Sequence, residues 1–73
     1  MRQAVAGYEQ MYQLGRKAYH KGLRCIPVND MEYMEYIRAK STGKPATVEG
    51  FRALTQLAEA WIGGWTVESL RAI

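Results

Sequence analysis

The side chains best suited to chemistry in this sequence are a lone histidine, His20, and a lone cysteine, Cys25. A catalytic base needs an orienting partner, and His20 has no carboxylate at helical spacing on its own face, which favours a surface position. Cys25 lies between Leu23 and Ile26, which favours a small buried hydrophobe over a redox centre. One histidine and one cysteine complete neither a zinc ligand set nor an internal disulfide. We therefore expect no catalytic residues, no metal site and no cofactor.

The run from Ser41 to Lys44 is superficially similar to a phosphate-binding loop. The first glycine of that motif would fall at Arg38, and its closing hydroxyl position is Pro45. The run is more typical of a helix end, so the sequence predicts a protein that is not an enzyme.

Positive charge is concentrated in the first third of the chain, although the net charge is only +3. Residues 1–27 carry five basic side chains against one acidic, whereas residues 28–73 carry five basic and six acidic ones. This asymmetry predicts a basic face that meets an acidic protein surface or lies close to nucleic acid. The alternative is that some of these charges only complement the dipole at a helix end. The expected partner-binding residues are Val5, Tyr8, Arg16, Lys17, Lys21 and Arg24, with Lys17 and Lys21 on the solvent side.

The elements that must position these side chains are helices, because apolar residues recur with helical spacing. Residues 3–21 are expected to form the first helix, which ends at Gly22 after Lys21. One face of this helix carries Ala4, Tyr8, Met11, Gly15, Ala18 and Gly22.

A second helix is expected from Asn29 to about Ser41, with Asn29 as its N-cap and Glu32 reaching back to complete a capping box. Its apolar face holds Tyr33, Met34, Tyr36 and Ile37.

Thr47 is the expected N-cap of a third helix. The apolar stripe of this helix comprises Val48, Phe51, Leu54, Leu57, Ala58, Trp61 and Ile62.

Two tryptophans, Trp61 and Trp65, flank a glycine pair in the third helix. Local rules leave open whether the helix breaks at Gly63 and Gly64, since two glycines cost about 2 kcal/mol relative to alanine. We expect this segment to dock on the small residues of the first helix, which are Gly15, Ala18 and Gly22.

The spacing of Gly15, Ala18 and Gly22, followed by Cys25, Pro27 and the segment from Trp61 to Trp65, resembles the ribosome modulation factor family of bacteria. The resemblance implies that the helix continues through the glycine pair, and that the chain binds ribosomes as a hibernation factor does. The chain departs from the family in having a longer stretch between Pro27 and Trp61.

In size, charge and opening residues, the whole chain also resembles small transcription regulators of Xanthomonas phages that bind the host RNA polymerase. That resemblance implies contacts near the amino-terminal part of the largest catalytic subunit, loss of the sigma factor and readthrough of terminators.

Together these observations predict an all-α single domain of three helices over residues 1–73. The sequence shows no signal peptide and no membrane span, so we expect a protein of the bacterial cytosol. An inhibitor of bacterial RNA polymerase is the preferred function, with a ribosome-binding hibernation protein as the alternative. A nucleotide- or antibiotic-modifying enzyme is disfavoured by the failed phosphate loop.

Overall fold

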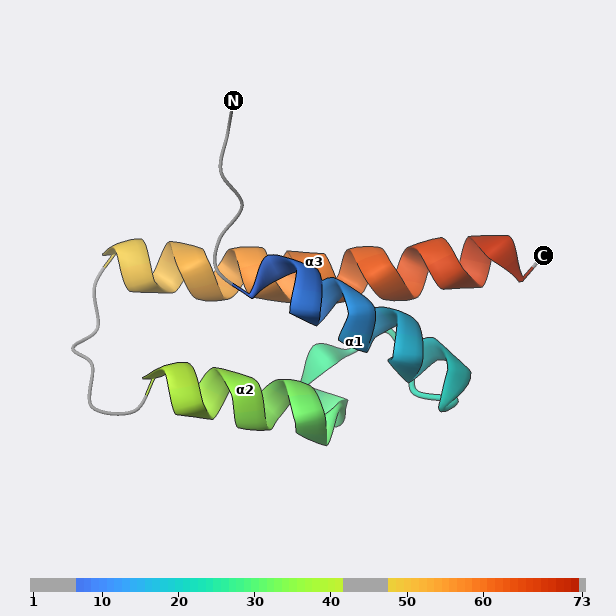
Figure 1. Cartoon of the computed structure of the whole chain (residues 1–73), viewed down its shortest axis with the longest axis horizontal. Helices are drawn as coiled ribbons and strands as arrows, with labels where there is room; N and C mark the ends of the chain where they lie inside the picture. The colour runs from blue at the N-terminus through green and yellow to red at the C-terminus, as the bar shows by residue number, and fades with distance from the viewer. Residues whose placement is uncertain (1–6, 42–47, 73) are drawn as a thin grey trace, which may run out of the picture.

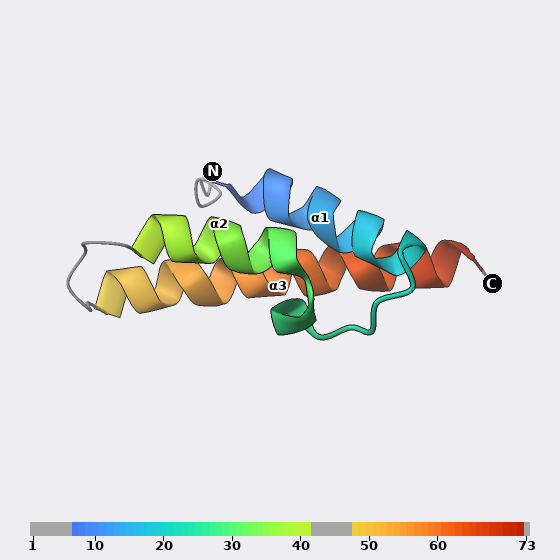
Figure 2. The ribbon, with the colours of Figure 1, turned by 90° about the horizontal axis from the view of Figure 1, so that it is seen from below.

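Three α-helices and one short 3-10 helix make up the part of the chain that the computed structural model describes, residues 7–41 and 48–72 (Figure 1). The elements are α1 (Tyr8–His20), η1 (Pro27–Asn29), α2 (Met31–Ser41) and α3 (Val48–Arg71). α3 is a long rod, α1 crosses its middle and C-terminal part, and α2 runs back beside its N-terminal part (Figure 1). In the perpendicular view of Figure 2, α1 and η1 lie on opposite sides of α3. The predicted all-α, three-helix fold is confirmed, and α1 and α3 make the most extensive contact.

The first helix is shorter than the sequence predicts. Gly7 has a φ of 90°, in the left-handed region, so the α-helix begins at Tyr8 and not at residue 3. Residues 3–6, with Ala4 and Val5, lie outside the described residues. The C-terminal end is as predicted, because Gly22 has a φ of 81° and the amide of Leu23 donates to the carbonyl of Ala18 at 3.0 Å. This pair of features is the Schellman motif, which satisfies the last carbonyls of the helix.

The second helix begins one residue later than predicted, and its cap is Asp30 in place of Asn29. Asn29 is the last residue of η1, and Asp30 Oδ1 accepts the amide of Glu32 at 3.0 Å. The Glu32 carboxylate does not complete a capping box, since it faces Lys17 of α1 and Lys21, the residue directly after α1. Asp30 can be buried as the cap of α2 because its second carboxylate oxygen, Oδ2, accepts the Nε1–H of Trp61 at 2.9 Å.

The third helix runs unbroken through Gly63 and Gly64, which answers the question that local propensity left open. Its predicted stripe is only partly correct, because Leu57 and Trp61 are buried whereas Val48 and Phe51 are exposed, Phe51 by 73%. The first turns of α3 extend past the start of α1, as Figure 1 shows, so their apolar side chains have no neighbouring α1 to cover them. Thr47, the predicted cap, lies outside the described residues.

α1 and α3 touch backbone to backbone at two reciprocal glycines. A Cβ on Gly15 would overlap the carbonyl oxygen of Trp61, and a Cβ on Gly64 would overlap the carbonyl oxygen of Tyr12. Gly15 therefore receives the main chain of Trp61 rather than its indole ring. No atom lies within 4 Å of a Cβ placed on Gly63, nor of one on Gly22, so these two glycines make no such contact.

The core is small and is centred on Trp61, which is fully buried. The Trp61 ring meets Tyr33 of α2 edge-on, with ring centroids 6.4 Å apart, and burial raises the pKa of the Tyr33 hydroxyl. Trp65 donates its Nε1–H to the carbonyl of Leu23 at 2.8 Å, which ties the link after α1 to α3. The buried apolar residues are Met11, Leu14, Ala18, Tyr33, Leu57, Ala60 and Trp61.

Candidate functional site

Cationic side chains of α1 gather around one carboxylate of α3 at the C-terminal end of α1. A shallow, open pocket of about 190 Å³ lies here, and it is lined by Gln13, Arg16, Lys17, His20 and Glu68. Arg16, Lys17 and His20 fall on neighbouring positions of α1 because three and four residues separate points on one helical face. The fold, and not the sequence, brings Glu68 to them.

Glu68 is the centre of this cluster, and its side chain is only 10% exposed. Arg16 Nε donates to Glu68 Oε1 at 2.6 Å, and His20 Nε2 lies 2.7 Å from Glu68 Oε2. An ionised carboxylate can only accept, so the imidazole hydrogen of this contact is on Nε2. The hydrogen bond from Arg16, and then that from His20, hold the pKa of Glu68 below its ordinary value. A carboxylate so buried is stable because both oxygens are paired.

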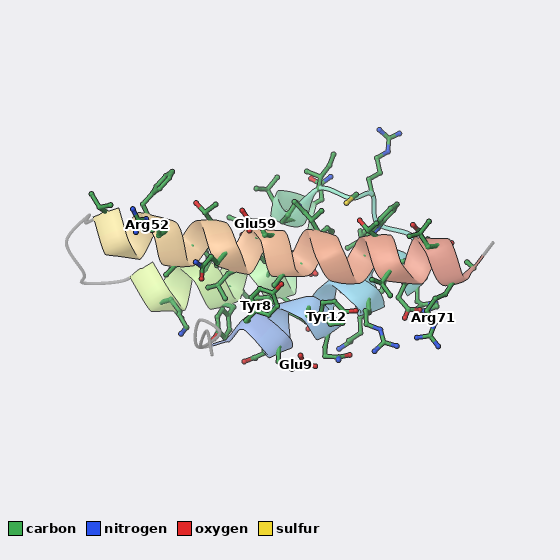
Figure 3. The ribbon with its side chains drawn as sticks, turned by 90° about the horizontal axis from the view of Figure 1, so that it is seen from above. Tyr8, Glu9, Tyr12, Arg52, Glu59 and Arg71 are labelled. Carbon is green, nitrogen blue, oxygen red and sulfur yellow. The ribbon has the colours of Figure 1, made fainter. Side chains whose placement is uncertain are left out.

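Arg71 adds a further cation from the end of α3. Its Nη1 lies 3.9 Å from Glu68 Oε1, and its side chain is 68% exposed. Figure 3 shows Arg71 at the C-terminal end of α3, on the side where α1 lies, and Arg52 near the opposite end of the same helix. Arg16 and Arg71 therefore both lie against the Glu68 carboxylate, and Lys17 lines the same pocket while its ammonium group faces Glu32 of α2.

Arg16 is held in place but keeps donors to spare. Its Nε is bonded to Glu68, and its Nη1 donates to Gln13 Oε1 at 3.3 Å. Gln13 is itself fixed by a bond from its amide to Glu9 at 2.9 Å. Within the described residues the Nη2 group of Arg16 makes no hydrogen bond. The Arg16 side chain is 34% exposed, and a guanidinium that is held through some of its donors can offer the others to an anionic oxygen.

The predicted basic face is not one continuous surface. Arg16 and Lys17 line the pocket, whereas Lys21 faces the start of α2, with its Nζ 3.6 Å from Asp30 Oδ1. Arg24 is exposed in the link after α1.

Lys17 and Lys21 are exposed as expected but are not free, because their ammonium groups lie 3.7 and 3.8 Å from the carboxylate of Glu32.

Tyr8 is partly exposed at the other end of α1, where Figure 3 also shows Glu9 and Tyr12, and Val5 lies outside the described residues. The residues of the glycine and tryptophan segments line the contact between α1 and α3 or cap α1, and Gly63 faces open space.

Sequence reasoning missed Glu68, Asp30 and Arg71 as parts of this arrangement. A signal for Glu68 exists, because it continues the buried positions Leu57, Trp61 and Gly64 at steps of four, three and four residues. A carboxylate in the next position of a buried stripe needs a cation from a neighbouring element. The sequence cannot say which cation, since Arg16 is 52 positions away.

Comparisons of the chain with protein-family models, curated proteins and solved structures found no match. Among the described residues there is no group of three histidine, cysteine or acidic side chains placed to hold a metal ion. None of the described helices combines the length and the apolar character needed to cross a membrane.

Proposed function

We propose that this protein binds bacterial ribosomes as a hibernation factor does, by placing the pocket at the end of α1 against phosphates of ribosomal RNA. The observation that carries the proposal is that Arg16, Lys17 and Arg71 gather around one pocket, two of them, Arg16 and Arg71, against the Glu68 carboxylate. Affinity for a polyphosphate rises with each phosphate that is neutralised, so cations gathered on one face are more effective than scattered ones. The proposal also agrees with the resemblance to the ribosome modulation factor family.

The residues that carry this resemblance serve the fold and leave the pocket free for a partner. Gly15 and Gly64 lie at the contact between α1 and α3, and Trp61 is buried. A fold can be kept while its function changes, so the basic cluster supports the proposal more directly than the motif does.

A second candidate is the preferred function of the sequence analysis, an inhibitor of bacterial RNA polymerase that displaces the sigma factor and promotes terminator readthrough. The observation that favours it is the exposure of Tyr8 at the start of α1 and of Arg24 in the link after α1, outside the pocket. An exposed aromatic ring and an exposed cation would suit an acidic protein surface near the amino-terminal part of the largest catalytic subunit. Both candidates act in the bacterial cytosol, and in both the protein is a binding protein without enzymatic turnover.

One experiment separates the two candidates. The tagged full-length chain is incubated at low and at high salt with purified bacterial ribosomes and, separately, with RNA polymerase core and holoenzyme. We expect cosedimentation with ribosomes that weakens steeply with salt. Retention on polymerase with sigma release, and none on ribosomes, would establish the second candidate in its place. Binding to neither at low salt would refute both.

Matched variants link the binding to the pocket. Arg71→Gln and Arg52→Gln remove the same charge from exposed positions near opposite ends of α3, and only Arg71 is beside the pocket. Arg71→Gln should weaken ribosome binding several-fold and reduce the slope of log affinity against log salt by about one. Arg52→Gln should leave both quantities unchanged, and equal effects of the two variants would show that only the total charge matters.

A further inference from the structure

We infer that the pocket binds a single phosphate group, held by the free edge of Arg16 together with Lys17 and Arg71, and that Glu68 is the positioning residue that orients Arg16, with His20 bonded to its other oxygen. This inference rests on the proposed function and assigns one phosphate of the proposed RNA contact to this pocket. The site uses only side chains of α1 and α3.

The first argument is geometric, because Glu68 fixes two donors at once. Its two oxygens are each within 2.7 Å of a nitrogen, one on Arg16 and one on His20. Arg16 and His20 are four residues apart on α1, so both side chains lie on one helical face. Bonds to a common carboxylate hold the two side chains side by side, and this removes part of the conformational entropy that a ligand would otherwise have to overcome.

The second argument concerns what the donors still offer. Glu68 accepts only from the Nε–H of Arg16, and the Nη2 group makes no hydrogen bond with any other described residue. The His20 side chain is 67% exposed, but its Nε2–H is already donated to Glu68, so Arg16 is the oriented residue that keeps a donor for a ligand. A tetrahedral anion with several acceptor oxygens can use a guanidinium edge and neighbouring ammonium groups together.

The third argument is electrostatic. Glu68 carries one negative charge, and Arg16, Lys17 and Arg71 carry three positive ones, so the site keeps a net positive charge even with His20 neutral. The Lys17 Nζ lies 3.7 Å from Glu32 Oε2 of α2, and this carboxylate partly neutralises its charge. Arg16 and Arg71 are therefore the main electrostatic contributors. The Glu68 carboxylate itself repels an anion, and its benefit must come from orientation.

These opposing roles of Glu68 make a sharp test with Glu68→Gln. This variant makes the site more positive by one charge but weakens the bonds that orient Arg16 and His20. Inorganic phosphate is titrated into the isotope-labelled full chain at constant ionic strength, and the Arg16 Nε–H and α1 amide resonances are followed. We expect a saturable shift in the wild type and about tenfold weaker phosphate affinity in Glu68→Gln, as for loss of an oriented charged hydrogen bond. Phosphate affinity that stays equal or increases in Glu68→Gln would overturn the positioning role.

A second pair of variants keeps the test decisive if Glu68→Gln does not fold. Arg71→Gln changes an exposed side chain and should weaken phosphate binding, with Arg52→Gln as the control of equal charge. Absence of any saturable shift in the wild type, or equal loss in both variants, would overturn the phosphate site.

The source of the phosphate is settled by competition. A short single-stranded RNA with hydroxyl ends offers only phosphodiesters, whereas a nucleoside monophosphate offers a terminal phosphate. Displacement of inorganic phosphate by the RNA supports a backbone ligand, and displacement by the nucleotide alone supports a small phosphorylated ligand at the same site. The two proposals fail separately: phosphate binding without ribosome binding removes the proposed function only, and ribosome binding without phosphate binding removes the subsite only.

Discussion

At the scale of single residues, two buried carboxylates organise this protein. Asp30 caps α2 and accepts the indole N–H of Trp61, and Glu68 accepts from Arg16 and His20. Each links helices that are distant in sequence. Burying either carboxylate without hydrogen-bond partners would cost free energy, so these partners are part of the reason that the fold accommodates a charge there.

The lowered pKa of Glu68 makes part of the stability dependent on pH. Because the folded carboxyl binds its proton less readily than the unfolded one, its contribution is complete above the ordinary glutamate pKa. That contribution is lost as the pH falls through the lower pKa of the folded state. The free energy of unfolding of the wild type should therefore fall more steeply on acidification than that of Glu68→Gln. Urea unfolding of both proteins from neutral to acidic pH measures the difference, and parallel curves would contradict the prediction.

At the scale of elements, the contact between α1 and α3 depends on which glycines meet the opposite backbone. Gly64 is buried against Tyr12, while its neighbour Gly63 faces open space. Gly15 lies against Trp61 from the other helix. Adjacent glycines of one helix thus have opposite roles.

Alanine substitutions should separate these roles by the sign of their effect. Gly64→Ala and Gly15→Ala each place a methyl group on a carbonyl oxygen, and should destabilise the fold by about 1–3 kcal/mol, as overpacking does. Gly63→Ala meets no atom and should stabilise the helix by up to about 1 kcal/mol. Thermal and urea unfolding of the three variants provide the comparison. Equal effects of Gly63→Ala and Gly64→Ala would argue against this crossing of α1 and α3.

Much of the element pattern could be predicted from the sequence, because helical spacing and the stop at Gly22 are local properties. The start of α1 could not, since the left-handed backbone at Gly7 interrupts a pattern that looks continuous. The choice between Asn29 and Asp30 as the cap depends on an indole 31 residues away from Asp30. The exposure of Phe51 depends on where α1 begins beside α3, which the periodicity of the sequence does not encode.

At the scale of the whole molecule, the fold partly cancels the charge asymmetry of the sequence. Three of the acidic residues from the second part of the chain, Asp30, Glu32 and Glu68, lie against basic side chains of the first third. The positive charge that remains around Arg16 and Arg71 is therefore more localised than the sequence suggests. The candidate site could be predicted only in part, because Arg16 and Lys17 are adjacent in sequence, whereas Arg71 and the acidic residues that pair with these cations come from later helices.

This cancellation changes the expected result of reversing Lys17 and Lys21. The sequence alone predicts that Lys17→Glu with Lys21→Glu preserves the fold, but both ammonium groups face acids at the start of α2. We expect the double reversal to lower the free energy of unfolding by about 1–2 kcal/mol, the range for a few exposed ion pairs turned repulsive. Denaturant unfolding at low and high salt measures it, and the loss should shrink at high salt.

The matched control reverses Arg24 and Arg52, which are exposed and form no ion pair with any described residue. This control should unfold like the wild type. Equal destabilisation of both double variants would show that net charge, and not the contact with α2, is responsible.

The different acceptors of the two indoles give the protein a pair of built-in optical reporters. Trp61 is fully buried beside the carboxylate of Asp30, so its fluorescence emission depends on the attachment of α2. Trp65 bonds to the Leu23 carbonyl and meets Tyr19, whose ring stands edge-on to His20 at the pocket. A ligand seated at the pocket should therefore perturb Trp65 while Trp61 emission stays constant, whereas detachment of α2 changes Trp61. Single-tryptophan versions with phenylalanine at the other position would let unlabelled protein distinguish occupancy from unfolding in one cuvette.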